Sequence, residues 1–260
     1  MPLGALLELL FPPVCLACHR ALPPRFAEAT ASASLLCGDC RQLLRPLDPE
    51  SSCPKCGCFP FRAAGAGCEE CEALPASFTS ARSAFPYSGP AGAMIRHMKY
   101  QHAPYIAPCA VDLAAEVVGD WLEANTRDTT LAPVPMRLRR ELSRGYNQAR
   151  LLAQALARRY GAPVLGEDDL VRARWSGPQA RHHTHVARLE NLQGAFAVRS
   201  PDAVRGLRFM VVDDVMTSGA TAAFAAQALR DAGAREVVLF SIVRASLGEG
   251  DSKLLEATAS

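Results

Sequence analysis

Two hydrophobic periods alternate along the last two-thirds of the chain. Short apolar runs of strand length are followed by stretches in which apolar residues recur every three or four positions, the spacing of one helix face. Strands are predicted at residues 81–87, 130–134, 209–213 and 236–243, and helices at residues 92–100, 108–124, 148–160 and 221–232. Strands that alternate with helices predict an α/β domain with a mostly parallel sheet.

The first quarter of the 260-residue chain lacks these periods and is rich in cysteine. Nine of the ten cysteines lie between Cys15 and Cys71. A Cys-x-x-Cys turn presents two thiolates on one side of a tight loop, and two such turns complete a tetrahedral shell for Zn²⁺. The sequence predicts two structural zinc sites of the zinc ribbon type, built from four such pairs: Cys15 and Cys18, Cys37 and Cys40, Cys53 and Cys56, Cys68 and Cys71.

A redox or disulfide role is the alternative use of these cysteines. Residues 1–11 are apolar but lack the basic start and small-residue cleavage site of a secretory signal. We therefore expect a cytoplasmic protein whose thiols stay reduced, which favours metal. Cys58 is left over as a bystander or an alternative ligand, and Cys109 lies in an apolar helical stretch and is predicted to fill the core.

Composition also divides the chain. Residues 1–76 are expected to form the zinc ribbon domain, residues 77–247 the α/β domain, and residues 248–260 a flexible tail. No apolar run approaches 18 residues, so membrane insertion is not expected.

Residues 131–199 hold 12 arginines against five acids. This excess predicts an anionic ligand, although a chain with 25 arginines and three lysines would also show a basic solvated face.

The most informative segment is residues 209–221. Four apolar residues predict a buried strand with Asp213 and Asp214 at its carboxyl end, followed by a small hydroxyl-rich loop and a helix start. Backbone N–H groups and a helix N-terminus in this position suit a dianionic phosphate. Adjacent carboxylates beside a phosphate suit a sugar diol or Mg²⁺.

This segment resembles the signature of the type I phosphoribosyltransferases, which bind 5-phosphoribosyl 1-pyrophosphate (PRPP). The resemblance implies that Asp213 and Asp214 hold the ribose hydroxyls. It also implies a 5′-phosphate loop made of Met216, Thr217, Ser218, Gly219, Ala220 and Thr221. Mg²⁺ would accompany the bound PRPP.

With the cysteine pairs in front, the chain as a whole resembles the ComF (competence protein F) family, which combines a double zinc ribbon with a type I phosphoribosyltransferase domain. The resemblance implies a pyrophosphate site at Pro135, Arg137, Arg140 and Arg144, which follow a predicted strand and end at the run Arg144-Gly145-Tyr146-Asn147-Gln148. It implies a mobile loop with Arg172, Gln179 and Arg188, and a hood lysine, Lys99, acting with the two aspartates. The chain departs from the family at Gln101, where glycine is usual, and at the histidine-rich run 182–185, which is expected to be an exposed segment rather than a metal or phosphate site.

Two functions follow from this resemblance. The favoured one is transfer of a phosphoribosyl group from PRPP with release of pyrophosphate. The alternative is a PRPP-sensing adaptor, without catalysis, in the uptake or use of extracellular DNA. Its zinc ribbons would bind a protein partner such as a helicase or the uptake machinery, or single-stranded DNA. Ordinary nucleobase salvage would leave the ribbons unexplained.

Overall fold

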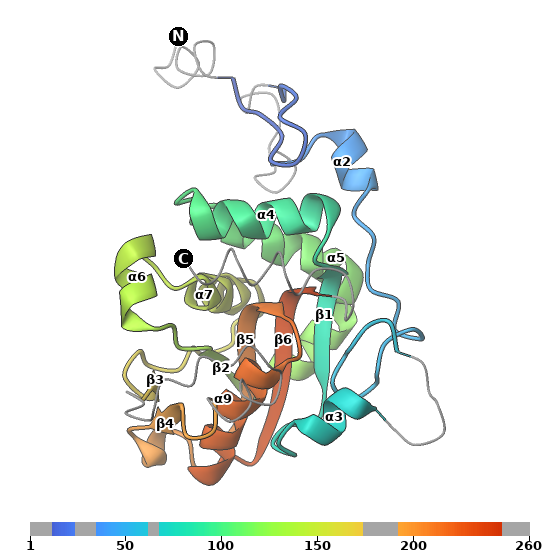
Figure 1. The fold of residues 1–260 in the computed structure, drawn as a ribbon. Coiled ribbons are helices and arrows are strands. Elements are labelled where there is room, and N and C mark those ends of the chain that lie inside the picture. The colour runs from blue at the N-terminus through green and yellow to red at the C-terminus, as the bar shows by residue number, and fades with distance from the viewer. Residues whose placement is uncertain (1–11, 24–34, 62–67, 174–191, 246–260) are drawn as a thin grey trace, which may run out of the picture.

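The α/β domain is built on a four-stranded parallel sheet. The computed structural model describes residues 12–23, 35–61, 68–173 and 192–245. The strands β1 (Ala81–Pro86), β2 (Thr129–Pro133), β5 (Arg208–Met216) and β6 (Glu236–Arg244) lie in the order β1-β6-β5-β2 (Figure 1). Every neighbouring pair is parallel. A separate antiparallel pair is formed by β3 (Leu170–Arg172) and β4 (Phe196–Val198). The predicted mostly parallel sheet is confirmed.

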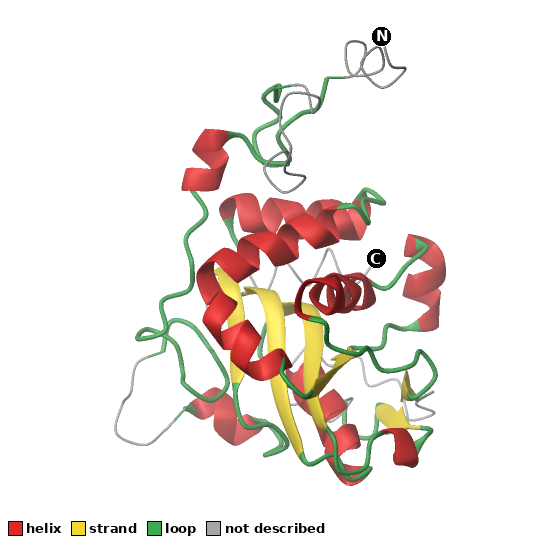
Figure 2. Ribbon diagram, turned by 180° about the vertical axis from the view of Figure 1, so that it is seen from behind, coloured by secondary structure: helices red, strands yellow, loops and turns green. Residues whose placement is uncertain are grey.

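Helices cover both faces of this sheet. Figures 1 and 2 show α4 (Gly89–Tyr100), α5 (Ile106–Thr126) and α7 (Gln148–Tyr160) on one side, and α9 (Ala220–Asp231) on the other. Helix α7 begins where the side chain of Asn147 accepts hydrogen bonds from the backbone N–H groups of Ala149 and Arg150, and it ends at Gly161 in the left-handed conformation. The four predicted helices are therefore present, with ends that differ by a few residues.

Three short helices and a strand end differ from the expected pattern. Helices α2 (Gly38–Gln42), α3 (Glu69–Ala73) and α6 (Leu138–Arg144) were not predicted. Strand β5 does not end at its first aspartate: it continues through Asp213 and Asp214 to Met216, which lies opposite Arg244 of β6. The reason is that β6 is equally long and keeps the ladder paired beyond the two acids.

Each sheet face has its own hydrophobic core, because successive strand residues point to opposite sides. On β5, Met210 and Val212 face a core shared with α4, α5 and α7, named here the α7 core. Phe209 and Val211 face a second core shared with α9, the α9 core. Cys109 of α5 is 4% exposed and belongs to the α7 core, which confirms its predicted role.

The two halves of the cysteine-rich segment join different cores. Cys15 and Cys40 pack into the α7 core with Met94 of α4, and Figure 1 shows α2 beside α4. Cys53, Cys56 and Cys58 pack into the α9 core. The cysteine-rich segment is thus in contact with both faces of the α/β domain. The predicted boundary after residue 76 stays a prediction, and the predicted tail lies outside the described residues. No helix in the described residues is both long and apolar enough to cross a membrane.

Candidate functional site

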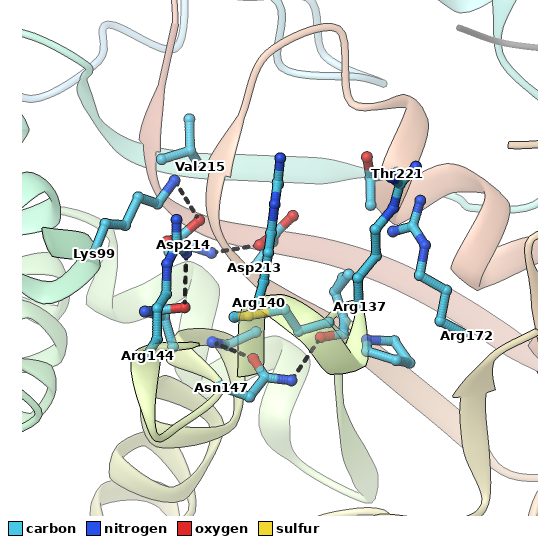
Figure 3. Close-up of a pocket in the computed structure, with 15 residues that line it drawn as sticks. Lys99, Arg137, Arg140, Arg144, Asn147, Arg172, Asp213, Asp214, Val215 and Thr221 are labelled. Atoms are coloured by element: carbon cyan, nitrogen blue, oxygen red, sulfur yellow. Dashed lines mark hydrogen bonds and ion pairs between the residues drawn. The ribbon is translucent and has the colours of Figure 1, made fainter. Parts of the chain in front are cut away.

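One pocket gathers most of the candidate residues at the carboxyl ends of β2 and β5. Its volume is about 320 Å³, a size that suits a small ligand. Figure 3 shows acidic side chains from β5 facing basic side chains from α4, α6 and β3. The lining residues are Lys99, Val134, Pro135, Met136, Arg137, Arg140, Arg144, Asn147, Gln148, Ala149, Arg172, Asp213, Asp214, Val215 and Thr221.

The acidic centre of the pocket is the adjacent pair on β5. The Oδ1 atom of Asp213 accepts a hydrogen bond from the backbone N–H of Asp214 at 2.8 Å. The Oδ1 atom of Asp214 lies 3.2 Å from Nζ of Lys99, and both side chains are largely buried. Burial and the neighbouring charge of Asp214 raise the pKa of Asp213 to about 7, while Lys99 opposes the rise. Asp213 therefore changes charge near neutral pH, where Mg²⁺ or a sugar hydroxyl would compete with its proton.

Lys99 is held in place by the segment that precedes α7. The carbonyl oxygen of Met98 accepts hydrogen bonds from the Tyr146 hydroxyl at 2.8 Å and from Nε2 of Gln148 at 3.2 Å. Asn147, between them, donates to the carbonyl of Val134 at 3.0 Å. The run Tyr146-Asn147-Gln148 thus ties α4, α7 and the end of β2 together. Sequence reasoning noted this run but gave these three side chains no role, since their partners lie 13 to 50 residues away.

The basic side of the pocket is a group of arginines. Arg137, Arg140 and Arg144 lie on or just before α6, and Arg172 ends β3. Figure 3 shows the side chains of Arg137 and Arg172 close to Thr221. Burial, followed by repulsion from Arg137 and Arg140, lowers the pKa of Arg172 to about 10, although Asp213 opposes this. Burial and repulsion from Arg144 likewise lower the pKa of Arg140. Cations that repel one another in a partly buried site would be stabilised by a multiply charged anion.

Residues 216–221 comprise the end of β5, the turn after it and the start of α9, and they are called the phosphate loop because the sequence predicts that they hold a phosphate. Gly219 adopts φ +82°, a conformation that side chains disfavour, and α9 begins at Ala220. Thr221 lines the pocket, and Thr217 is exposed. Met216 is 2% exposed and its side chain packs in the α9 core. Only the backbone of Met216 could therefore contact a ligand. Ser218 Oγ accepts from the N–H of Ala220 at 3.4 Å.

Two of the predicted mobile-loop residues, Gln179 and Arg188, lie outside the described residues, as does the histidine-rich run 182–185. Arg172 alone of that group is placed, and it lines the pocket. Its guanidinium also lies over the ring of Phe196, 5.1 Å from the centroid.

The eight paired cysteines form two clusters with the predicted partners. The first cluster is Cys15, Cys18, Cys37 and Cys40; the second cluster is Cys53, Cys56, Cys68 and Cys71. In each, all four sulfur atoms lie within 4.8 Å of one another. A tetrahedral ZnS₄ site with bonds of about 2.3 Å requires sulfur atoms about 3.8 Å apart.

The sulfur spacing agrees with this geometry. The distances are 3.6 Å for Cys18 to Cys37, 3.7 Å for Cys53 to Cys71 and 3.6 Å for Cys56 to Cys68. Burial alone would raise the pKa of Cys15 and Cys53, but hydrogen bonds, chiefly from backbone N–H groups, lower these values to about 6 and about 7. Burial raises the pKa of Cys40, Cys56 and Cys71. The first thiol of each cluster is therefore favoured as the thiolate that binds zinc, whereas burial opposes deprotonation of these three. The fifth cysteine of this region, Cys58, is buried with its sulfur 3.4 Å from that of Cys68.

Comparison with known proteins agrees with these features. Residues 6–72 match the family model of the double zinc ribbon domain. The chain is 30% identical to the DNA utilization protein YhgH of Salmonella typhi over 80% of its own length and 90% of the relative's. It is also 30% identical to the competence protein F of Haemophilus influenzae, over 61% of this chain and 70% of that protein.

A solved structure is similar over a smaller part. The glutamine PRPP amidotransferase of B. subtilis, complexed with ADP and GMP, matches 56% of this chain with 19% identity and a TM-score of 0.35. The match spans 30% of that enzyme's chain. The predicted order of zinc ribbon modules followed by an α/β domain with a mostly parallel sheet is confirmed. Since the relatives are 30% identical and are covered over most of their length, the chain belongs to the ComF family of competence and DNA utilization proteins.

Proposed function

We propose that the pocket binds PRPP with Mg²⁺ and that the protein transfers the phosphoribosyl group with release of pyrophosphate. One observation carries the proposal: two adjacent carboxylates face several arginines across a single cavity, next to a glycine-containing loop that starts a helix. PRPP has the matching parts, since a ribose diol separates a pyrophosphate from a 5′-phosphate.

The ligand's parts are assigned by charge and position. Asp213 and Asp214 would hold the ribose hydroxyls, and the phosphate loop with the N-terminus of α9 would receive the 5′-phosphate. Pro135, Arg137, Arg140 and Arg144 would line the pyrophosphate side, where guanidinium groups donate two hydrogen bonds at once. Arg172, with Gln179 and Arg188 of the same segment, would close over the ligand.

The chemistry needs no nucleophilic side chain. Displacement at ribose C1 passes through an oxocarbenium-like state as pyrophosphate leaves, so this chain's residues act by positioning and by neutralising charge. The two aspartates are the hard oxygen ligands that Mg²⁺ prefers, and Mg²⁺ would supply further neutralisation of the leaving group. Lys99 would act at the same carboxylates, since it already contacts Asp214.

Calorimetry with PRPP and MgCl₂ tests the binding step. We expect saturable heat for the wild type and its loss in the double variant Asp213→Asn with Asp214→Asn. The matched control is Asp168→Asn with Asp169→Asn, a second pair of adjacent aspartates that lies outside the pocket. Absence of heat in the wild type with millimolar PRPP and Mg²⁺ would contradict the proposal.

The second candidate is a PRPP-sensing adaptor, and the relatives favour it because their names refer to competence and DNA utilization rather than to a transfer reaction. In that case PRPP occupies the same pocket, and the zinc ribbons bind a protein partner or single-stranded DNA. Pyrophosphate release during incubation with PRPP, Mg²⁺ and a panel of nucleobases separates the two, because the adaptor binds PRPP and releases none. Direct DNA binding would weaken steeply between about 50 and 200 mM salt.

A further inference from the structure

Arg244, the last residue of β6, is the largest of the fully buried side chains in the described residues. It is 1% exposed, and its Nη1 atom donates a hydrogen bond to the carbonyl of Cys56 at 3.0 Å. Its Nε and Nη2 atoms have no hydrogen-bond partner in the described part of the chain. A guanidinium buried in this way is costly unless opposite charge lies close by.

The opposite charge belongs to the second cluster. The hydrogen bond to the carbonyl of Cys56 places the guanidinium beside a ligand of that cluster. Four cysteine thiolates around one Zn²⁺ carry a net charge of about −2, which is the compensation that a buried cation needs. The cluster and the arginine therefore stabilise each other when the metal is bound.

The same guanidinium also lies against the phosphate loop. A methyl group placed on Gly219 would lie 3.6 Å from Nη1 of Arg244 and 3.7 Å from Cδ1 of Leu74, which directly follows α3. The N–H of Ala245 donates to the carbonyl of Met216 at 2.9 Å, so the backbone beside Arg244 is bonded to the start of the loop. The backbone of Gly219 is therefore enclosed by side chains from the second zinc ribbon and from the end of β6.

A second contact joins the ribbon segment to the first turn of α9. The hydroxyl of Ser77 donates to the carbonyl of Ala223 at 2.8 Å, and Ser77 is 4% exposed. Together with Leu74, this contact places the chain that leaves the second cluster directly against the loop and helix that would receive a phosphate.

We propose that Arg244 couples the second zinc site to the phosphate loop, so that zinc holds the loop in its anion-binding conformation and a bound phosphate in turn retains the zinc. The second half of this statement rests on the proposed binding of PRPP. Coupling between two sites is reciprocal: if metal favours the anion by some factor, the anion favours the metal by the same factor. Arg244 is a positioning residue in this scheme, since it lies behind the loop and outside the pocket lining.

The first cluster supplies the internal control. Its neighbouring cations, Arg20 and Arg41, pair with Asp39 and Glu116, and all four side chains are between 40% and 69% exposed. Solvent screens these pairs, and neither arginine lines the pocket. Loading of the first cluster is therefore expected to be independent of a ligand in the phosphate loop.

The test measures cysteine alkylation by peptide mass spectrometry on the full-length, zinc-loaded protein, with and without PRPP and Mg²⁺. In the wild type, saturating ligand is expected to slow labelling at the second cluster about fivefold to tenfold and to leave the first cluster unchanged. In Arg244→Met, labelling at the second cluster is faster and the ligand no longer slows it. Arg41→Met is the matched control and retains the wild-type pattern.

Hydrogen exchange of the phosphate loop tests the link without any ligand. Amides of residues 216–221 are expected to exchange several-fold faster in Arg244→Met than in the wild type or in Arg41→Met. Arg244→Lys, which keeps the charge but loses the planar fork, is the second variant in case the methionine variant does not fold, and it should give an intermediate rate.

The outcomes separate this inference from the proposed function. If calorimetry shows no PRPP binding to the wild type, the proposed function fails, and the exchange measurement still decides whether Arg244 links the two sites. If PRPP binds but labelling of the second cluster does not change in the wild type, the coupling is overturned. That arm needs no variant, so a folding defect cannot obscure it.

Discussion

The two cysteine clusters have the same ligand set and occupy very different surroundings. The first cluster packs against the α7 core beside α4, the helix that carries Lys99, and the cations next to it, Arg20 and Arg41, are exposed to solvent. The second packs against the α9 core, and its neighbours Arg244 and Leu74 lie against Gly219 of the phosphate loop. The two clusters therefore pack on opposite faces of one sheet, and no cysteine of either cluster lines the pocket. The comparison teaches that zinc sites of one kind can have different neighbours, according to which sheet face they cover.

The largest expected difference comes from removing each metal site in turn. Cys53→Ser with Cys56→Ser would leave polar groups and a gap in the α9 core, and Arg244 would lose its compensating charge. Structural zinc contributes on the order of 10 kcal/mol, which is comparable to the whole stability of a domain. We expect this variant to unfold the α/β domain, as followed by circular dichroism during thermal melting.

The corresponding change in the first cluster is Cys15→Ser with Cys18→Ser, the first Cys-x-x-Cys pair of that cluster, beside which the described residues hold no buried arginine. Here we expect loss of one zinc, measured by metal analysis, with the sheet domain still folded. Equal melting behaviour of the two variants would remove the distinction between the clusters.

Two leucines allow a second comparison of the clusters, with a smaller expected loss in the free energy of unfolding. Leu22 beside the first cluster is 7% exposed and Leu74 beside the second is 8% exposed, so Leu→Ala should cost each about 2–4 kcal/mol in the free energy of unfolding. Only Leu74 lies against the position of Gly219. Leu74→Ala should therefore also lower the affinity for PRPP, measured by calorimetry, whereas Leu22→Ala should leave the affinity within about twofold at a temperature where both are folded.

These contrasts also show which features a sequence can predict. The cysteine pairs and the acidic segment 209–221 are local motifs, each contained within a few residues. Spacing predicted the cysteine clusters, and the order of apolar, acidic and hydroxyl residues predicted a buried strand followed by a helix. The hydrogen bond between Arg244 and Cys56 joins residues 188 positions apart. In the sequence, Arg244 simply follows the apolar run of a predicted strand, and nothing marks it as buried. No local pattern could have revealed this hydrogen bond, because the partner is chosen by the fold.

Helix α6 escaped prediction for a different physical reason. Its leucines, Leu138 and Leu142, are 63% and 75% exposed, so the helix buries no apolar face that a periodic pattern could reveal. Strands β3 and β4 have three residues each, too few to show alternation. The arginines of this segment were therefore chosen by their proximity to a proline-rich turn and by resemblance, and the structure supplies the helix that places two of them, Arg140 and Arg144, in the pocket lining with Arg137 just before it.

The pH dependence of PRPP binding tests the side of the pocket where Lys99 of α4 lies close to the two aspartates. The pKa of Asp213 is raised to about 7, so this carboxyl is protonated below that pH and charged above it. Mg²⁺ and ribose hydroxyls need the charged form, so the affinity should rise as pH increases through about 7 and level off above it. Calorimetry between pH 5.5 and 8.5 measures the midpoint, and Asp213→Asn should remove this part of the profile.

Lys99→Met should move that midpoint upward, because Lys99 is the cation that lowers the pKa of Asp213. Leu74→Ala, on the other face of the sheet, should weaken binding at every pH and leave the midpoint in place. A midpoint that shifts equally in both variants would mean that the two sides of the pocket do not act independently.

The smallest expected effect concerns the ion pair that joins the first ribbon to α5. Arg41 contacts Glu116, and the two side chains are 40% and 47% exposed, so water and salt screen the attraction. Arg41→Ala should lower the free energy of unfolding by less than about 1 kcal/mol, by less still in high salt, and should not alter PRPP affinity. Urea melts at low and high ionic strength measure this. A loss of several kcal/mol that persists in salt would mean that the first ribbon is fastened to the helices by charge rather than by the apolar packing of Leu16 and Leu22 in the α7 core.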